Sequence, residues 1–167
     1  QNWNLDFVKK SRQGSNFKNL ANRISECLSF MNACGVNNEN VRQLSETKFF
    51  ISHEALLLPY ESAFTRIDST TGDWYNVSAH LLWIGDRTRQ ITGAHVEFCS
   101  GISNPIGIKV GPSTDKDDLI KIIKKINPNN EKGKILLIVR MGAKDIDNLF
   151  PPILRSIIKA KLNVVWS

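Results

Sequence analysis

Charged side chains stand where four apolar runs of the sequence end, and their types are those that bind anions. The runs and charges are 48–52 with Glu54, 81–84 with Asp86 and Arg87, 106–110 with Lys109, and 134–139 with Arg140. If the runs are parallel strands, their carboxyl ends meet at one edge, where three cations and two carboxylates would form one pocket. Arginine binds phosphate or carboxylate groups through paired hydrogen bonds, and lysine adds a compact positive charge. The pattern predicts a site for a small polyanionic substrate, such as a phosphorylated acid.

An alternative interpretation is that each charged residue forms a salt bridge at its own strand end and takes no part in binding, since structural ion pairs also cluster charge. That alternative explains any single position as well as a binding site does. The shared site is preferred because charge follows four runs at the same end, which is the arrangement that catalysis at the mouth of a barrel requires.

The three histidines are candidates for acid–base or metal-binding roles, because the imidazole pKa lies near neutral pH. None of them lies in the H-E-x-x-H spacing of a helical zinc site. Of His53, His80 and His95, the first is the strongest candidate because it stands beside Glu54 at a strand end. Ser52 and His53 do not form a catalytic dyad, because adjacent strand residues point to opposite faces. No glycine-rich phosphate loop can be built from the sequence.

The three cysteines, Cys27, Cys34 and Cys99, match no C-x-x-C spacing. Cys27 and Cys34 are seven residues apart, so on a helix they share a face, and we expect them in the core. Reduced, buried thiols that bind no metal are predicted for all three.

The rest of the sequence alternates predicted strands with predicted helices. Strands are predicted over 48–52, 81–84, 106–110, 134–139 and 163–166. Helices are predicted from a Ser15 cap to Gly35, over 55–66 with a start or kink at Pro59, over 92–102, from a cap at 113 or 114 to Ile126, and over 150–162 with two prolines in the first turn. Ala94, Phe98 and Ile102 are expected on one side of their helix, and 68–76 is expected to be a turn-rich loop.

Each predicted strand is followed by a helical or turn segment, and the spacing is about 30 residues, the length of one βα unit. Repeated βα units with charge at the C-terminal ends predict an α/β fold of the (β/α)8 TIM barrel type. A doubly wound open sheet has the same alternation and is the alternative. The five units make a partial barrel. We expect a helical segment and linker over 1–47 and the central βα units of the barrel over 48–167.

Composition narrows the class of protein. The chain has 167 residues, of which 41% are apolar, enough for a core. No apolar run approaches the roughly 20 residues of a membrane helix, and no signal-peptide pattern is present, so a soluble protein without a membrane partner is expected. The net charge of +6 suits an anionic substrate. Nucleic-acid binding is the weaker interpretation, because no arginine-rich tract, zinc finger or aromatic RNA-binding pattern occurs. Because the chain opens at Gln1 and ends in a predicted strand, we expect an internal piece of a longer protein.

Several long motifs resemble those of one enzyme family. The segments FISHEALLLPYESAFTR, SAHLLWIGDRTRQITGAHVEF and GISNPIGIKVGPS look very like the class II, plant-like 3-deoxy-D-arabino-heptulosonate 7-phosphate (DAHP) synthases. RMG with DIDNLFPPIL, NWNLDFV and the segment ending in MNACGV are similar to the same family. The resemblance covers nearly the whole chain.

The resemblance implies a (β/α)8 barrel enzyme at the entry to the shikimate pathway, which leads to chorismate and the aromatic amino acids. The family's reaction condenses phosphoenolpyruvate with D-erythrose 4-phosphate to DAHP and phosphate, using a divalent metal such as Mn2+. Carried over by motif, Arg87 of GDRTRQ, Lys109 of GIKVGP and Arg140 of VRMG bind phosphoenolpyruvate through its phosphate and carboxylate. Asp86 stands in the same site, where many relatives have glutamate, and Glu54 of SHEAL holds a water near the carbon that is attacked. Glu54, Asp86 and Lys109 are thus the expected catalytic residues.

The same resemblance implies that the metal ligands, a Cys, a His, a Glu and an Asp, lie outside this chain, so the fragment alone is predicted to be inactive. The segment 15–35 resembles a region that binds an aromatic amino-acid regulator in some relatives.

A homo-oligomer, in the cytoplasm or in a plastid of a photosynthetic eukaryote, is expected for the complete protein. The alternative function is a catalytically inactive, anion-binding relative or a regulatory module.

Overall fold

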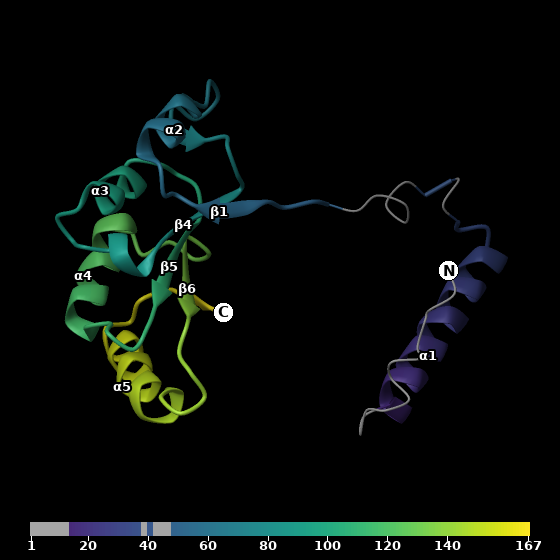
Figure 1. Cartoon of the computed structure of the whole chain (residues 1–167). Coiled ribbons are helices and arrows are strands. Elements are labelled where there is room, and N and C mark those ends of the chain that lie inside the picture. The colour runs from purple at the N-terminus through teal and green to yellow at the C-terminus, as the bar shows by residue number, and fades with distance from the viewer. Residues whose placement is uncertain (1–13, 38–39, 42–47) are drawn as a thin grey trace. The chain divides into compact units, whose positions relative to one another are not determined.

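The computed structural model describes residues 14–37, 40–41 and 48–167 (Figure 1). The chain divides into two compact units, one ending at Phe49 and the other beginning at Phe50. The segment 1–13 and most of the predicted linker before Lys48 lie outside the described residues. The domain boundary expected between residues 47 and 48 stays a prediction.

The first unit contains helix α1, Gly14–Ala33. The chain leaves the helix at Gly35, as predicted, because the φ of +80° at this residue is the left-handed conformation that glycine adopts without strain. The Val36 N–H then donates to the Met31 carbonyl oxygen over 2.9 Å and satisfies one of the last carbonyl groups. Ser15 lies inside the helix, so the predicted cap at this residue is wrong.

The cysteines divide between exposed and buried positions. Cys27 and Cys34 are exposed, which contradicts the core position predicted for them. Helical spacing shows which residues share a face, but it does not show whether another element covers that face. Cys99, in the second unit, is buried as predicted, and this burial raises the pKa of its thiol to about 12.

The second unit is built on a five-stranded parallel sheet. Its strands are β1 (Ser52–Glu54), β4 (Leu81–Ile84), β5 (Ile106–Val110), β6 (Ile135–Val139) and β7 (Val165–Trp166), and they lie side by side in that order. Each strand of the sheet therefore pairs with the next one along the chain, and a crossover connects every pair. The α/β fold predicted from the alternation of strands and helices is confirmed.

Three helices pack along one side of this sheet: α3 (Ala94–Ser100), α4 (Lys116–Ile126) and α5 (Ile146–Lys159), as Figure 1 shows. The core between them takes alternate strand residues, namely Leu82, Ile84, Ile106, Ile108, Val110, Ile135 and Leu137, all fully buried. Four residues of α4 and two of α5 complete it: Leu119, Ile122, Ile123, Ile126, Ile153 and Ile157. The strand residues in between, Leu81, Trp83, Leu136 and Ile138, point to the opposite face and are only partly buried.

Between β1 and β4 the chain forms helix α2 (Leu58–Ala63) and an antiparallel pair of strands, β2 (Thr65–Ile67) and β3 (Trp74–Asn76). Pro59 lies in the first turn of α2, as predicted. The hairpin was not predicted, and the assignment of 68–76 to a loop is wrong for its last three residues. Strands of three residues that mix polar and apolar side chains carry too little alternation to be recognised.

Strand β1 and helix α5 begin elsewhere than predicted. β1 starts at Ser52, and Phe50 and Ile51 before it are exposed, because an apolar run becomes a buried strand only where a partner covers it. α5 starts at Ile146 rather than 150, so its two prolines lie inside the helix and not in its first turn. In the described parts of the chain, no helix is long and apolar enough to cross a membrane.

Helices α3 and α4 also differ from prediction in detail. α3 buries Val96 and Cys99; of the three residues expected on one side of the helix, Ile102 is buried, Phe98 is partly buried and Ala94 is exposed. α4 is capped by Asp115 rather than by residue 113 or 114. Asp115 Oδ1 accepts two hydrogen bonds of 2.9 Å from backbone N–H groups of the first turn. Thr114 Oγ1 instead accepts the N–H of Gly111 over 2.9 Å, in the turn that follows β5.

Candidate functional site

Strands β1 and β5 bring a carboxylate and an ammonium group together on the partly buried face of the sheet. Glu54 ends β1 in register with Trp83 of β4, which lies in register with Gly107 of β5. Residues two apart on a strand share a face, so Lys109 projects to the same side as Glu54. Lys109 Nζ lies 2.9 Å from Glu54 Oε2, and the two side chains are 29% and 28% exposed. This ion pair is the centre of the candidate site.

Trp83 contacts both members of the pair. Its indole N–H donates to Glu54 Oε2 over 3.2 Å, and Lys109 Nζ lies 5.6 Å from the centroid of its ring, within cation–π range. Gly107 leaves space for this side chain, because a Cβ at that position would lie 2.7 Å from Trp83 Cβ. Trp83 was not among the predicted site residues, since an aromatic residue in an apolar run indicates core rather than chemistry.

The surroundings of Glu54 lower the pKa of its carboxyl group. The largest cause is the hydrogen bond from Lys109; the hydrogen bond from Trp83 and the charges of Lys109 and Arg87 act in the same direction, while partial burial opposes them. Glu54 is therefore ionised at neutral pH and can accept a hydrogen bond from a water molecule or a ligand.

The turn after β4 is a short 3₁₀ helix, η3 (Asp86–Thr88), and it carries two predicted site residues. Asp86 Oδ1 lies 3.0 Å from Arg89 Nε, and Arg89 also donates to Ser113 Oγ over 3.3 Å, so Arg89 links the loops after β4 and β5. Asp86 Oδ1 faces Gly111, where a Cβ would lie 3.2 Å away. Asp86 thus pairs with Arg89 rather than with Lys109. Arg89, whose side chain is only 12% exposed, was not predicted, because its two partners come from different loops.

Arg87 and Arg140 are exposed at the ends of β4 and β6. The charge of Arg87 acts on the Glu54 carboxyl, so the two groups lie within electrostatic range of one another. The Arg140 N–H donates to the Val110 carbonyl oxygen over 2.9 Å, which holds the end of β6 beside the end of β5. The carbonyl oxygen of Arg140 lies 3.8 Å from the place where a Cβ on Gly111 would stand.

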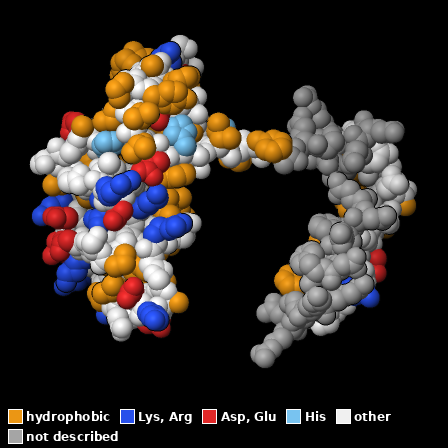
Figure 2. All heavy atoms as spheres, viewed as in Figure 1, with side chains coloured by type: hydrophobic (Ala, Val, Ile, Leu, Met, Phe, Trp, Pro, Cys, Tyr) orange, Lys and Arg blue, Asp and Glu red, His pale blue; other side chains and the backbone are white. Residues whose placement is uncertain are grey.

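The five predicted residues therefore gather at one edge of the sheet, in two groups. Glu54 and Lys109 are in contact, with Arg87 in electrostatic range, and the Asp86 carboxylate and the backbone carbonyl oxygen of Arg140 both lie near Gly111. Figure 2 shows basic and acidic side chains side by side on the visible face of this unit, with apolar side chains gathered over α2 and the hairpin at the top of the view. The catalytic and binding roles of the five residues stay predictions.

The three histidines form their hydrogen bonds with groups other than the ion pair. His53 precedes Glu54 but projects to the other side of β1, where its Nε2 lies 2.7 Å from Glu61 Oε1. His95 Nε2 lies 3.1 Å from a backbone carbonyl oxygen, and His80 Nδ1 accepts a backbone N–H over 3.1 Å. None of these contacts places an imidazole against the Glu54 carboxylate.

Within the described residues, no group of three or more His, Cys, Asp and Glu side chains is arranged to hold a metal ion. Glu54, at the centre of the site, is paired with the ammonium group of Lys109, and that positive charge opposes a cation at the same place. The residues of this part of the chain therefore do not fit a resident metal.

A parallel sheet with its charged side chains at the C-terminal strand ends defines an α/β protein of the kind that binds ligands at that edge. The family follows from comparison with known proteins. The model of the class-II DAHP synthetase family matches residues 1–167. The chain belongs to this family.

Three curated relatives match almost all of the chain. It is 48% identical over 162 residues to the probable phospho-2-dehydro-3-deoxyheptonate aldolase, chloroplastic, of Catharanthus roseus, covering 97% of this chain and 33% of that protein. It is 47% identical over 164 residues to the phospho-2-dehydro-3-deoxyheptonate aldolase of Streptomyces coelicolor, covering 98% and 36%. It is 43% identical over 169 residues to the phospho-2-dehydro-3-deoxyheptonate aldolase AroG of Mycolicibacterium smegmatis, covering 98% and 36%. The chain thus spans about a third of the length of the curated relatives it matches.

Proposed function

We propose that the complete protein containing this chain is a DAHP synthase, a transferase that condenses phosphoenolpyruvate with erythrose 4-phosphate and releases phosphate. The observation that carries this proposal is the Glu54–Lys109 pair at the strand ends, 2.9 Å apart and partly exposed, with Arg87 in electrostatic range. Membership of the class-II DAHP synthetase family supports the choice of substrates, as do the names of the three relatives.

In this proposal Arg87, Lys109 and Arg140 bind the phosphate and carboxylate groups of phosphoenolpyruvate, because guanidinium and ammonium groups match these anions in charge and geometry. The Glu54 carboxylate accepts a hydrogen bond from the water near the carbon that is attacked. Asp86, through its contact with Arg89, orients the turn that carries Arg87. A divalent metal such as Mn2+ belongs to the proposed activity, with ligands outside the residues described above.

The fold that we propose for the complete protein is a (β/α)8 barrel, of which 48–167 supplies the central βα units. The order of the strands supports it, since each strand pairs with its successor in the chain and the helices α3, α4 and α5 pack on one face. A doubly wound sheet requires a reversal of strand order, and the five strands of the described sheet contain none. A plastid is one expected compartment, because the Catharanthus relative is named chloroplastic. A homo-oligomer stays part of the proposal.

Turnover by the complete protein tests the function. Loss of phosphoenolpyruvate is followed with erythrose 4-phosphate present, with and without Mn2+, for the wild type, Lys109→Ala and Lys121→Ala. Lys121 is the matched control, because it also has a carboxylate at 2.9 Å but lies exposed on α4. We expect metal-dependent loss in the wild type and the control, and a rate at least about 100-fold lower in Lys109→Ala. Turnover by Lys109→Ala at the wild-type rate would overturn the assignment of the site. Binding of phosphoenolpyruvate by the wild type without any turnover would favour an inactive anion-binding relative.

A further inference from the structure

Helix α2 buries a carboxylate, while apolar side chains in it and next to it are exposed. Glu61 is 2% exposed and is the one buried residue of α2, whereas Leu57 and Tyr60 nearby are 66% and 50% exposed. Burying a carboxylate is unfavourable unless its oxygens are hydrogen-bonded. Specific partners must therefore hold Glu61 where it lies.

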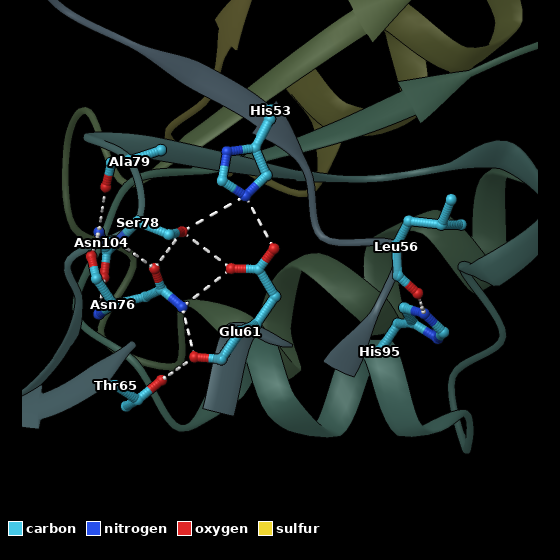
Figure 3. A network of polar contacts seen from close by, with 9 residues as sticks. All are labelled: His53, Leu56, Glu61, Thr65, Asn76, Ser78, Ala79, His95 and Asn104. Atoms are coloured by element: carbon cyan, nitrogen blue, oxygen red, sulfur yellow. Dashed lines mark hydrogen bonds and ion pairs between the residues drawn. The ribbon is translucent and has the colours of Figure 1, made fainter. Parts of the chain in front are cut away.

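Those partners form the network drawn in Figure 3. Glu61 Oε1 lies 2.7 Å from His53 Nε2, and Glu61 Oε2 accepts hydrogen bonds from Asn76 Nδ2 over 3.0 Å and Ser78 Oγ over 2.9 Å. Asn104 extends the network, since its Oδ1 accepts the Asn76 N–H over 2.7 Å. A carboxylate oxygen only accepts, so His53 donates through Nε2. Fully partnered networks of this kind fix geometry more than they add stability.

The network touches β1 next to the candidate site. His53 directly precedes Glu54, and adjacent residues of a strand point to opposite faces. A contact that fixes His53 toward α2 therefore also fixes the direction in which Glu54 leaves the strand, toward Lys109. β1 has only three residues and pairs with β4 alone among the described strands, so side-chain contacts carry much of its positioning.

The chain is held on the other side of Glu54 as well. The Ala55 N–H donates to the Trp83 carbonyl oxygen over 3.0 Å. The Leu56 carbonyl oxygen accepts a hydrogen bond from His95 Nε2 over 3.1 Å, which ties this segment to α3 (Figure 3). Residues on both sides of Glu54 are therefore held by hydrogen bonds. On its N-terminal side, the nearest of these contacts is the one between His53 and Glu61.

We propose that His53 and Glu61 are positioning residues, whose contact on one face of β1 aims Glu54 at Lys109 on the other. The inference rests on the proposed function, in which Glu54 and Lys109 act on phosphoenolpyruvate. The group is not a nucleophilic triad: His53 Nε2 faces both Ser78 Oγ, at 3.3 Å, and Glu61, whereas a triad needs the carboxylate on the other ring nitrogen.

Two variants of the complete protein separate the proposed role from general support of the fold. His53→Gln keeps an N–H donor at about the place of Nε2, and His53→Met fills similar space without a donor. His80→Met is the control for loss of a different contact next to β1, because His80 accepts the Ile51 N–H and lies against the Phe50 ring, outside the Glu61 network. If His53→Met does not fold, His53→Asn replaces it. The asparagine side chain is too short for its N–H group to reach Glu61, so the same changes are expected as for His53→Met.

The first readout does not depend on enzymatic activity. Trace acylation followed by peptide mass spectrometry gives the labelling rate of Lys109 relative to that of Lys121. An ammonium group released from its carboxylate partner is more accessible to the reagent. The labelling rate of Lys109 relative to Lys121 should therefore rise about two- to fivefold in His53→Met, which is the change in equilibrium expected when a partly exposed ion pair is lost. It should stay at the wild-type level in His53→Gln and His80→Met. Unchanged labelling in His53→Met would overturn the proposal, whether or not the protein is a synthase.

The second readout is the pH profile of kcat/KM. Lys109 and Arg87 are the charged groups that lower the pKa of Glu54, so releasing Glu54 raises that pKa and moves the acidic limb of the profile to higher pH in His53→Met. A loss of folded protein would lower the rate equally at every pH. An acidic limb that stays in place would contradict the positioning role, and absence of turnover in the wild type would refute only the proposed function.

Discussion

The Glu54–Lys109 pair sits where a ligand can reach it. More than a quarter of each side chain is exposed, and solvent weakens ion pairs of this kind to less than about 1 kcal/mol. The pair therefore contributes little to the free energy of folding. Breaking it so that Lys109 and Glu54 contact a ligand instead requires little free energy. Trp83 contacts both groups, through its indole N–H to Glu54 and its ring beside the Lys109 ammonium group.

Replacement of Glu54 by glutamine tests the energetics of the pair. The folded state lowers the pKa of Glu54, so its stabilising effect is present above its ordinary pKa of 4.5 and is lost as pH falls through the lowered value. We expect Glu54→Gln to reduce the free energy of unfolding in urea by less than about 1 kcal/mol at pH 7, and the two proteins to converge in acid. A difference that widens on acidification would contradict the assigned pKa shift.

At the residue scale, the sequence indicated the charged residues but not how they pair. Glu54, Lys109, Arg87, Asp86 and Arg140 could be named because each stands at or just past the end of an apolar run. Trp83 and Glu61 could not, because an indole within a strand and an acid within a helix look like core and solvated surface. Their contacts depend on residues from other elements, which no local pattern records.

At the scale of elements, continuous apolar runs were the most reliable guide. β4 and β5 span the residues predicted for them, since each places alternate side chains in the core and the others on a partly buried face. The start of β1 was predicted four residues too early and its end two residues too early, and the β2–β3 hairpin was missed. β1 is polar where it pairs and apolar before the strand, where the chain is exposed, and the hairpin strands mix polar and apolar residues, so tertiary contacts override the local pattern.

Alanine substitutions at two glycines separate an effect on the position of Glu54 from an effect on the packing of the sheet. A Cβ on Gly85 would lie 2.2 Å from Glu54 Oε1, the end of a flexible side chain, whereas a Cβ on Gly107 would lie 2.7 Å from Trp83 Cβ, close to the backbone of β4. We expect Gly85→Ala to fold with wild-type stability but to lose most of its activity, because Glu54 must move. Gly107→Ala should lower the free energy of unfolding by about 1–3 kcal/mol, as overpacking does.

Thermal unfolding and turnover of the two alanine variants provide the comparison. Equal destabilisation of both proteins would mean that Glu54 is held as rigidly as the sheet itself. Full activity of Gly85→Ala would show that the position of the Glu54 carboxylate does not matter to the reaction.

At the scale of the whole molecule, the described sheet presents one well-packed face and one that is only partly buried. Val165 is 48% exposed and Leu136 and Ile138 are partly buried, while the helices cover the other face. The relatives are about three times as long as the chain. We propose that further βα units complete both the barrel and the active site.

The 167-residue chain by itself should therefore not catalyse the reaction. Its described residues hold no group of ligands for a metal ion, and a barrel that is not closed cannot bring all of its strand ends around a substrate. The measurement is DAHP formation by the chain alone and by the complete protein at equal concentration with Mn2+. Turnover by the chain alone would show that the missing units are not needed.

The central claim is that Lys109, beside Glu54 at the strand ends, binds phosphoenolpyruvate. The most direct measurement is the dissociation constant of phosphoenolpyruvate, by titration calorimetry without erythrose 4-phosphate, for the complete protein, Lys109→Ala and Lys121→Ala. We predict a dissociation constant at least about tenfold higher for Lys109→Ala, because a hydrogen bond to a charged group is lost, and no change for Lys121→Ala. Equal affinity of the wild type and Lys109→Ala would contradict the site.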